Sequence, residues 1–267
     1  MSKKLKIFFI IFAGVLLFVF CVFYYNYFNN KSEVIFFNVG QGDSALIDLP
    51  GNNEILIDGG PDKTVLYKLN KYLPIYNRNI ELLILSHPHS DHITGLIEVL
   101  KRYKVKKVMF ADVQYDSVVY TEFKKIIQKK NIEIIKLENF YDDFIEIIYF
   151  NNKKLDDAND NSIVFRLNNV NKKILFAGDI SVDIEKEILN NADYNLLKAD
   201  ILKVAHQGSI TSSSEEFVSA VDPDFAVISV GENDFGHPSL RVIKRLERAG
   251  AEILRTDLND DVRFDLK

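Results

Sequence analysis

The stretch that decides the fold is SHPHSDHITG, residues 86–95. The chain has five histidines, and three of them fall within this stretch. Pro88 disfavours helix for the residue before it, so we expect His87 and His89 on extended backbone. Side chains two residues apart in an extended segment point to the same side. The spacing therefore predicts that these two histidines bind one metal ion together.

Asp91 and His92 are adjacent and cannot bind an ion in that way. They suit the turn into the following helix, where they would face a second ion beside the first. Imidazole and carboxylate ligands fit zinc, manganese or iron. The one cysteine, Cys21, lies in the apolar N-terminal stretch, which excludes a cysteine-rich zinc site. A histidine-rich surface loop is the alternative, but the HxHxDH pattern favours a metal site.

The first thirty residues differ from the rest. Lys3, Lys4 and Lys6 precede a charge-free run at 7–30 that is long enough to cross a bilayer. The lysines favour a cytoplasmic N-terminus and an exported C-terminal domain. A cleaved signal peptide is the alternative, but the bulky residues at 20–25 crowd the place where small cleavage-site residues would sit. We therefore predict a single-pass membrane protein.

Residues 1–31 are thus predicted to form the anchor and residues 32–267 one domain of about 235 residues, enough for a single large core. The net charge of −5 argues against attraction of nucleic acid to the whole surface, but it allows a local basic groove. Strands are expected at 34–38, 45–49, 54–57, 82–85, 107–110, 132–136, 144–150, 162–167, 173–176, 201–204 and 225–229. Helices are expected at 94–103, 117–130, 182–190, 215–221 and 240–249, with a polar loop at 151–161. Mixed strands with covering helices predict an α/β sandwich.

Two further motifs have ordinary explanations of their own. In LFAGD, Asp179 ends a hydrophobic strand, where a carboxylate can bridge two cations or, more simply, cap the helix that follows. In VGQGD, at 39–43, the two glycines are explained by a hairpin turn. His206 and His237 both end predicted strands, and a lone histidine there is usually only a partly exposed polar residue. Neither motif identifies a site without the histidine cluster.

Seven motifs together resemble the metallo-β-lactamase superfamily, in particular the metallo-hydrolase domain of the ComEC-type DNA-uptake proteins. They are FNVGQGDSALI (37–47), LIDGG (56–60), SHPHSDHITG (86–95), NDNSIVFRL (159–167), LFAGD (175–179), LKVAHQGS (202–209) and FGHPS (235–239). The resemblance runs from about residue 34 to the end. It implies a four-layer αββα sandwich with a dinuclear site at one edge of the sheets.

The resemblance also implies roles for individual residues. Two divalent ions, zinc or manganese, would be held by His87, His89, Asp91, His92, Asp179 and His237, with Asp179 bridging. His206 would donate a proton to the leaving group or contact phosphate, although the roles of His206 and His237 could be exchanged. Asp91 would belong to the catalytic site as well as being a ligand. Asp58 would orient the metal-binding histidines, and Asp43 would line the site.

The chain departs from the family pattern in two places. Gln207 stands where the family usually has the second histidine of a pair. The polar run at 159–162, including Asn161 and Ser162, replaces a further histidine ligand that many members carry before the bridging aspartate. One ion would then be held more loosely by oxygen ligands, which favours manganese or a labile second zinc.

Two basic clusters could follow a phosphate backbone. The first recurs at helical spacing just after the last motif and consists of Arg241, Lys244, Arg245 and Arg248. The second comprises Lys101, Arg102, Lys104, Lys106 and Lys107. A solvated helix surface is the favoured explanation of the first cluster.

The expected function is metal-dependent hydrolysis of a phosphodiester, with DNA at the cell surface as the substrate that the resemblance suggests. The membrane is the expected partner, through the N-terminal helix. A cell-envelope phosphocholine or teichoic-acid esterase is the first alternative. A non-catalytic accessory component of a competence or envelope complex is the second.

Overall fold

Two β-sheets pack face to face and carry the site at one edge. The computed structural model describes residues 2–29, 31–51, 53–140, 142–151, 157–169 and 171–267. The seven-stranded sheet has the order β13 (Val262–Asp265), β1 (Glu33–Phe36), β2 (Ala45–Leu49), β3 (Asn53–Ile57), β4 (Asn79–Ile84), β5 (Lys104–Met109) and β6 (Glu133–Ile135). The six-stranded sheet has the order β12 (Glu252–Arg255), β11 (Phe225–Ile228), β10 (Ile201–Lys203), β9 (Lys173–Phe176), β8 (Val164–Asn168) and β7 (Ile145–Tyr149).

Both sheets are mixed. Strands β13, β1, β2 and β3 pair antiparallel, and β3 to β6 pair parallel. In the second sheet β7, β8 and β9 are antiparallel, whereas β9 to β12 run parallel. Parallel strands are usually buried on both faces, so they read as nearly continuous apolar runs. The carboxyl ends of β9, β10 and β11 consequently lie at one edge.

Alternate residues of each strand enter different cores. In β1, Phe36 lies between the two sheets, and its neighbour Ile35 faces the opposite core. In β9, Phe176 meets Phe36 with ring centroids 5.7 Å apart, while Leu175 faces outward to the second helix layer. The two-residue period of the strands therefore builds three cores between four layers.

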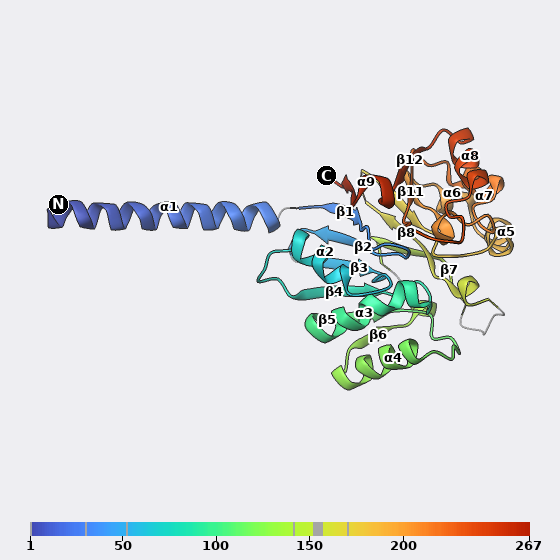
Figure 1. Cartoon of the computed structure of the whole chain (residues 1–267), viewed down its shortest axis with the longest axis horizontal. Helices are drawn as coiled ribbons and strands as arrows, with labels where there is room; N and C mark the ends of the chain where they lie inside the picture. Colours follow the sequence, from blue (N-terminus) through green and yellow to red (C-terminus); the bar gives the residue numbers. More distant parts are fainter. Residues whose placement is uncertain (1, 30, 52, 141, 152–156, 170) are drawn as a thin grey trace.

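Helices cover the outer face of each sheet (Figure 1). One layer consists of α2 (Thr64–Tyr72), α3 (Ser90–Arg102) and α4 (Val118–Lys130). The other consists of α5 (Val182–Asn191), α6 (Tyr194–Leu197), α7 (Glu215–Val221) and α8 (Leu240–Arg248). A short α9 (Thr256–Asn259) joins β12 to β13, and three 3₁₀ turns occur: η1 (Leu137–Asn139), η2 (Ala158–Asn161) and η3 (Ala205–Gly208). The predicted four-layer αββα sandwich is confirmed.

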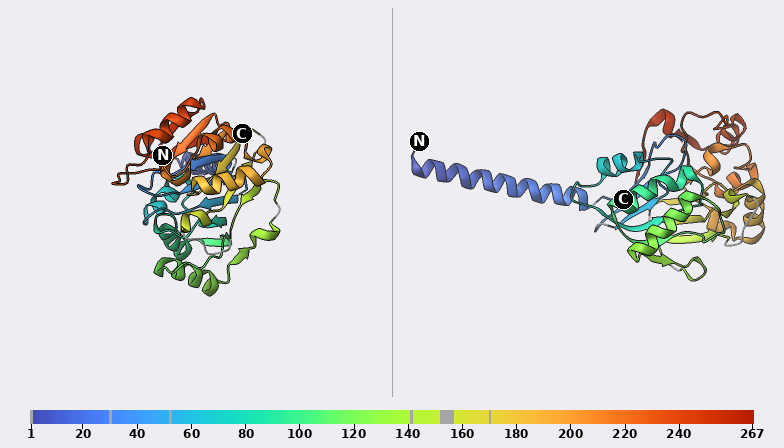
Figure 2. Two further views of the ribbon diagram at one scale, coloured as in Figure 1. Left: turned by 90° about the vertical axis from the view of Figure 1, so that its right-hand side faces the viewer. Right: turned by 60° about the horizontal axis from the view of Figure 1, so that its bottom comes forward.

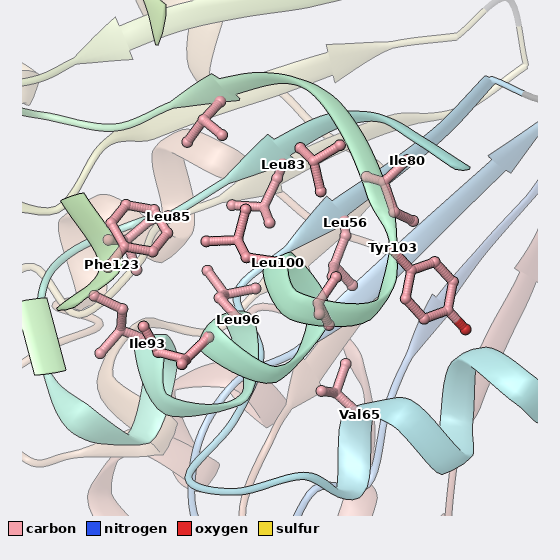
Figure 3. Packing of buried hydrophobic residues seen from close by; sticks show 14 of the residues in the cluster. Leu56, Val65, Ile80, Leu83, Leu85, Ile93, Leu96, Leu100, Tyr103 and Phe123 are labelled. Atoms are coloured by element: carbon pink, nitrogen blue, oxygen red, sulfur yellow. The ribbon is translucent and has the colours of Figure 1, made fainter. Parts of the chain in front are cut away.

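The first helix layer is fixed by close packing over β3 and β4. Ile93, Leu96 and Leu100 of α3 meet Leu56 and Leu83 of the sheet (Figure 3). The approach is closest where α3 crosses the end of β3, because a Cβ on the glycine at position 95 would lie 1.9 Å from the carbonyl oxygen of the glycine at position 59. Glycine at both positions therefore brings the first turn of α3 against the turn that follows β3.

The structure also corrects several expected boundaries. Helix α3 begins at Ser90 rather than at position 94, because His89 is already extended and serves as the N-cap position. The helices α2, α6 and α9 and the strands β12 and β13 were not predicted. Of the polar loop expected at 151–161, residues 152–156 lie outside the described residues, and Ala158–Asn161 forms η2.

The N-terminal helix α1 (Lys3–Asn29) projects away from the sandwich (Figures 1 and 2). Within its segment Lys3–Tyr25, an 18-residue window has a mean hydropathy of 3.0, and none of that window is buried. A helix of that length and composition is a candidate membrane span, as the sequence predicts.

Candidate metal centre

The histidine cluster lies between the end of β4 and the first turn of α3. His89 is extended, with φ −68° and ψ 151°, whereas Asp91 and His92 belong to the first turn of the helix. The carbonyl oxygens of Asp91 and His92 accept hydrogen bonds from the backbone N–H groups of Asp43 (3.3 Å) and of the glycine at position 59 (2.7 Å). The backbone of the cluster is therefore held by two other loops.

Asp179 lies between the two ligand sets that the sequence predicts. Its Oδ2 is 3.9 Å from His87 Nε2 and 3.4 Å from His92 Nε2. On one side, His87 Nε2 is 3.2 Å from His89 Nδ1. On the other, His92 Nε2 is 3.6 Å from Asp91 Oδ2. A single carboxylate is thus shared by a His87–His89 side and an Asp91–His92 side.

The last two histidines complete the far side of the cluster. His206 follows β10 in η3, and its Nε2 lies 4.0 Å from Asp179 Oδ2. His237 lies between β11 and α8, and its ring meets the ring of His206 edge-on, with centroids 5.5 Å apart. All five histidines of the chain therefore gather at one edge of the two sheets.

Asp58 determines which nitrogen of His92 faces the site. Its Oδ2 lies 2.9 Å from His92 Nδ1, and the two Asp58 oxygens accept hydrogen bonds from the backbone N–H (2.8 Å) and the hydroxyl (2.7 Å) of Ser86. A carboxylate held in this way favours a proton on Nδ1, so that the lone pair of Nε2 points towards Asp179. A neutral imidazole binds a metal through the lone pair of one ring nitrogen, and this tautomer makes Nε2 that nitrogen.

Three buried atoms of the cluster have no hydrogen-bond partner among the described residues: His92 Nε2, Asp179 Oδ1 and His237 Nδ1. Buried polar atoms are normally paired, so orphaned atoms call for another group. One atom each from His87, His92 and Asp179 lies within 4.8 Å of the others. The donor set of imidazoles and carboxylates fits divalent transition ions. These residues therefore fit a metal centre.

Burial and charge set the protonation of the cluster. Burial lowers the pKa of His87 well below its ordinary value of 6.5, and the neighbouring His92 lowers it further. Burial also opposes charge on His92, but Asp179 and Asp58 outweigh it and hold the pKa of His92 well above 6.5. His92 and His87 likewise overcome the burial of Asp179 and lower its carboxyl pKa well below 3.8. The metal-free cluster thus consists of paired charges.

The polar run that replaces a histidine lies against Asp179. The hydroxyl of Ser162 accepts a hydrogen bond from the backbone N–H of Asp179 at 2.9 Å, and Asp160 Oδ1 accepts one from Ser181 at 2.9 Å. Asn161 is buried, and its amide nitrogen donates to the carbonyl of Asn151 at 3.0 Å. The run therefore supports the loop that carries Asp179. Ser181, not Asp179, occupies the N-cap position of α5.

Asp43 and Gln207 make polar contacts next to the histidine cluster. Asp43 forms a buried ion pair with Lys203, with 2.6 Å between Oδ2 and Nζ. Burial, opposed by Lys203, raises the pKa of the Asp43 carboxyl to about 6. The amide of Gln207 donates to Asp91 Oδ2 at 2.7 Å. Sequence reasoning missed Lys203, Ser86 and Gln41, although each lies inside a motif that it identified.

The predicted phosphate-binding residues of α8 divide into two pairs. Arg245 donates to the backbone carbonyls of Ser212 (3.2 Å) and Ser213 (2.9 Å), and Arg248 pairs with Glu215 at 3.1 Å. Arg241 and Lys244 are exposed. Of the four residues, Arg241 and Lys244 are therefore the two whose side chains reach solvent without a hydrogen bond or an ion pair to the described residues like those of Arg245 and Arg248.

Comparison with known proteins agrees with this geometry. The family model described as "Metallo-beta-lactamase superfamily" matches residues 37–232. ComE operon protein 3 of Bacillus subtilis is 28% identical over 93% of this chain and 35% of its own length. Competence protein ComA of Neisseria gonorrhoeae is 29% identical over 89% of this chain and 33% of its length. The chain thus spans about a third of these curated relatives.

Among solved structures, Tm1679, described as a metal-dependent hydrolase of the β-lactamase superfamily, superposes with a TM-score of 0.56. The match covers 87% of this chain and 99% of Tm1679 at 12% identity, so it speaks for the fold. The family match covers most of the sandwich and includes the HxHxDH cluster and Asp179. The chain belongs to the metallo-β-lactamase superfamily.

Proposed function

We propose that this protein is a metal-dependent phosphodiesterase that cleaves nucleic acid on the outer side of the membrane. The observation that carries the proposal is the position of Asp179 Oδ2, within 4.0 Å of ring nitrogens of His87, His92 and His206. One carboxylate shared by two ligand sets suits two neighbouring cations. The similarity to two competence proteins over about nine-tenths of this chain supports nucleic acid as the substrate.

We assign the ligands of the two ions to two groups of residues. His87 and His89 would hold one ion, Asp91, His92 and His237 the other, and Asp179 both. When bound, two divalent ions would supply activation of a water molecule and stabilisation of charge on a phosphoryl group.

The remaining groups act on orientation and proton transfer. Asp58 fixes the tautomer of His92 through its contact with Nδ1. His206 is partly exposed, so it can reach a substrate at the mouth of the site and donate a proton to the departing oxygen. The rings of His206 and His237 are in contact, so the alternative assignment exchanges their roles. In that assignment His237 donates the proton and His206 binds the ion.

Hydrolysis assays on the detergent-solubilised full chain test the proposal. The substrates are labelled single-stranded DNA, labelled duplex DNA and a phosphocholine ester, each with Mn²⁺, Zn²⁺ or a chelator. We expect metal-dependent cleavage of DNA, and we expect His89→Ala to abolish it because one ion loses a ligand. Gln128→Ala, on the exposed face of α4, is the control for handling and folding.

The results separate the candidate functions. Chelator-sensitive DNA cleavage that His89→Ala removes supports the proposal. Cleavage of the phosphocholine ester alone selects the envelope esterase instead. Metal binding without turnover of any substrate selects the accessory role. Undiminished DNA cleavage by His89→Ala would contradict the assignment of the site.

A further inference from the structure

A chain of side-chain amides connects Asp91 to a backbone N–H on the opposite loop. The backbone N–H at position 231 donates to Gln41 Oε1 at 3.1 Å, and Gln41 Nε2 donates to Gln207 Oε1. Gln207 Nε2 then donates to Asp91 Oδ2 at 2.7 Å. The four groups come from the loop after β11, the loop between β1 and β2, η3 and the first turn of α3.

The backbone group fixes the direction of every hydrogen bond in this chain. A backbone N–H can only donate, so it must face the oxygen of the Gln41 amide. The amide nitrogen of Gln41 then faces Gln207 and selects its oxygen. The nitrogen of Gln207 is left to face Asp91. Although the two ends of a glutamine amide look alike in shape, only one orientation of each satisfies the whole chain.

The surrounding backbone holds the two amides in place. A Cβ at position 231 would lie 2.4 Å from the carbonyl carbon at position 40 and 2.6 Å from the nitrogen of Gln41, so the absence of a side chain lets the two loops touch. Gln207 is buried and has a φ of 53°, which is unfavourable for a residue other than glycine. Such a conformation persists where the neighbouring contacts compensate for its cost.

We propose that Gln41 and Gln207 form a polarised amide relay that positions the Asp91 carboxylate for the second metal ion. The relay always presents an N–H to Asp91 Oδ2, the oxygen that lies 3.6 Å from His92 Nε2. Asp91 is half-exposed, so without this contact its carboxylate could rotate towards solvent. Gln41 and Gln207 are positioning residues, because both act through the Asp91 carboxylate. The inference rests on the metal centre of the proposed function and is independent of the substrate.

The relay predicts that its direction can be reversed from a distance. In Gln41→Glu the introduced carboxylate still accepts from the N–H at position 231, but it presents an oxygen to Gln207. Gln207 must then turn its nitrogen away from Asp91 and place its oxygen there. In Gln41→Met the relay loses its link and Gln207 is free to keep its orientation. The first substitution should therefore be more harmful than the second, although neither touches Asp91.

Metal binding by the full chain in detergent tests this order. Zn²⁺ and Mn²⁺ are titrated against a chromophoric chelator, and bound metal is counted by elemental analysis. For Gln41→Glu we expect at least about a tenfold loss of affinity for the second ion, with the first ion unaffected, in line with other groups that orient metal ligands. Gln41→Met should lose less, and Gln207→Met should resemble Gln41→Glu.

The controls make the outcome decisive. Gln128→Glu carries the same change of charge on an exposed face of α4 and should bind both ions as the unmodified chain does. Thermal unfolding of each metal-free variant checks that it is folded, and Gln41→Met covers the case in which Gln41→Glu is not. Equal second-ion affinity in Gln41→Glu and the unmodified chain would overturn the relay, as would an unmodified chain that binds a single ion. Absence of DNA cleavage with normal metal binding would instead overturn only the proposed function.

Discussion

At the scale of single residues, Phe235 stands out as an aromatic ring beside the candidate metal centre. It is 75% exposed, and its ring lies 5.8 Å from that of His237 at a tilt of 35°. Stacking of a nucleobase on such a ring contributes about 1–3 kcal/mol to binding. We expect Phe235→Leu to raise KM for single-stranded DNA by about tenfold while kcat changes little, as measured by steady-state cleavage of a labelled oligonucleotide.

Two controls isolate the stacking. Phe235→Tyr keeps an aromatic ring and should keep the KM of the unmodified chain. An oligonucleotide without bases offers nothing to stack, so Phe235→Leu should not change its KM. If Phe235→Leu cleaves both oligonucleotides as the unmodified chain does, Phe235 has no part in substrate binding.

The contiguous part of the site could be predicted from the sequence, and the rest depended on contacts across the fold. His87, His89 and His92 lie within one short motif, whose spacing alone predicts one ion shared by His87 and His89 and a second ion beside His92. The contact between Gln207 and Asp91 joins residues 116 positions apart. Gln207 could be identified as unusual, but no local pattern indicates which side chain its amide meets.

At the scale of elements, the Lys203–Asp43 ion pair joins the two sheets beneath the site. Lys203 belongs to β10 of the six-stranded sheet, and Asp43 to the loop between β1 and β2 of the other. Removing one partner of a buried pair leaves an unpaired charge and typically costs about 3–5 kcal/mol. We expect Lys203→Met to lower the free energy of unfolding by about that amount, measured by urea denaturation at pH 8.

A double variant distinguishes the loss of the pair from the loss of packing. Lys203→Met combined with Asp43→Asn removes both charges and should recover part of the stability lost in Lys203→Met alone. No recovery in the double variant would show that the lysine stem, rather than its charge, holds the sheets together.

Three acidic side chains lie side by side at the start of the sandwich. Glu33, Asp48 and Glu54 are in register on β1, β2 and β3, and all three are buried. Burial, reinforced by Glu54, raises the pKa of Asp48 from 3.8 to about 7, with Lys31 and Arg263 opposing the shift. The folded state therefore binds more protons than the unfolded state between about pH 4 and pH 7. This contribution to stability is present at low pH and is lost as the pH rises through 7.

The raised pKa of Asp48 predicts the direction in which a substitution there changes the free energy of unfolding. Asp48→Asn removes the buried charge and should stabilise the protein at pH 8 on the order of 1–3 kcal/mol, with a smaller gain at pH 5. Urea denaturation at both values measures the difference, and Asp183→Asn on the exposed face of α5 is the matched control. A gain that is the same at both values of pH would contradict a raised Asp48 pKa.

Elements with a strong local pattern could be predicted, and elements that depend on distant partners could not. The strands that alternate between two cores carry long apolar runs, and they were predicted. Helix α2 buries only Val65 and Leu69, and its N-cap position, Lys63, makes no capping hydrogen bond, so its local signal is weak. Strand β13 is completed only by pairing with β1, from the other end of the chain.

At the scale of the whole molecule, the charges at the start of α1 predict its orientation. Lys3, Lys4 and Lys6 precede the apolar segment and favour the cytoplasmic side for the N-terminus. We expect a protease added outside spheroplasts to digest the sandwich while α1 stays protected. Exchange of all three lysines for glutamate should make part of the population resistant. Complete resistance of the unmodified chain would place the sandwich in the cytoplasm.

The α/β sandwich could be predicted from mixed strands with covering helices, and its four-layer arrangement from the family resemblance that the seven motifs carry. The relative placement of α1 and the sandwich is a property that no motif encodes. Between Asn29 of α1 and Glu33 of β1, only positions 30–32 intervene.

That short connection has a mechanical consequence. Three residues span at most about 10 Å, so the sandwich would stay close to the lipid surface and diffuse with it in two dimensions. A pull on the anchor would enter β1, which is paired with β2 on one side and β13 on the other. Such a load acts along both strand pairs at once. The hydrogen bonds of the two pairs must therefore break together rather than one after another. In the proposed nuclease, these two strand pairs would resist a pull on the nucleic acid while it is being cut.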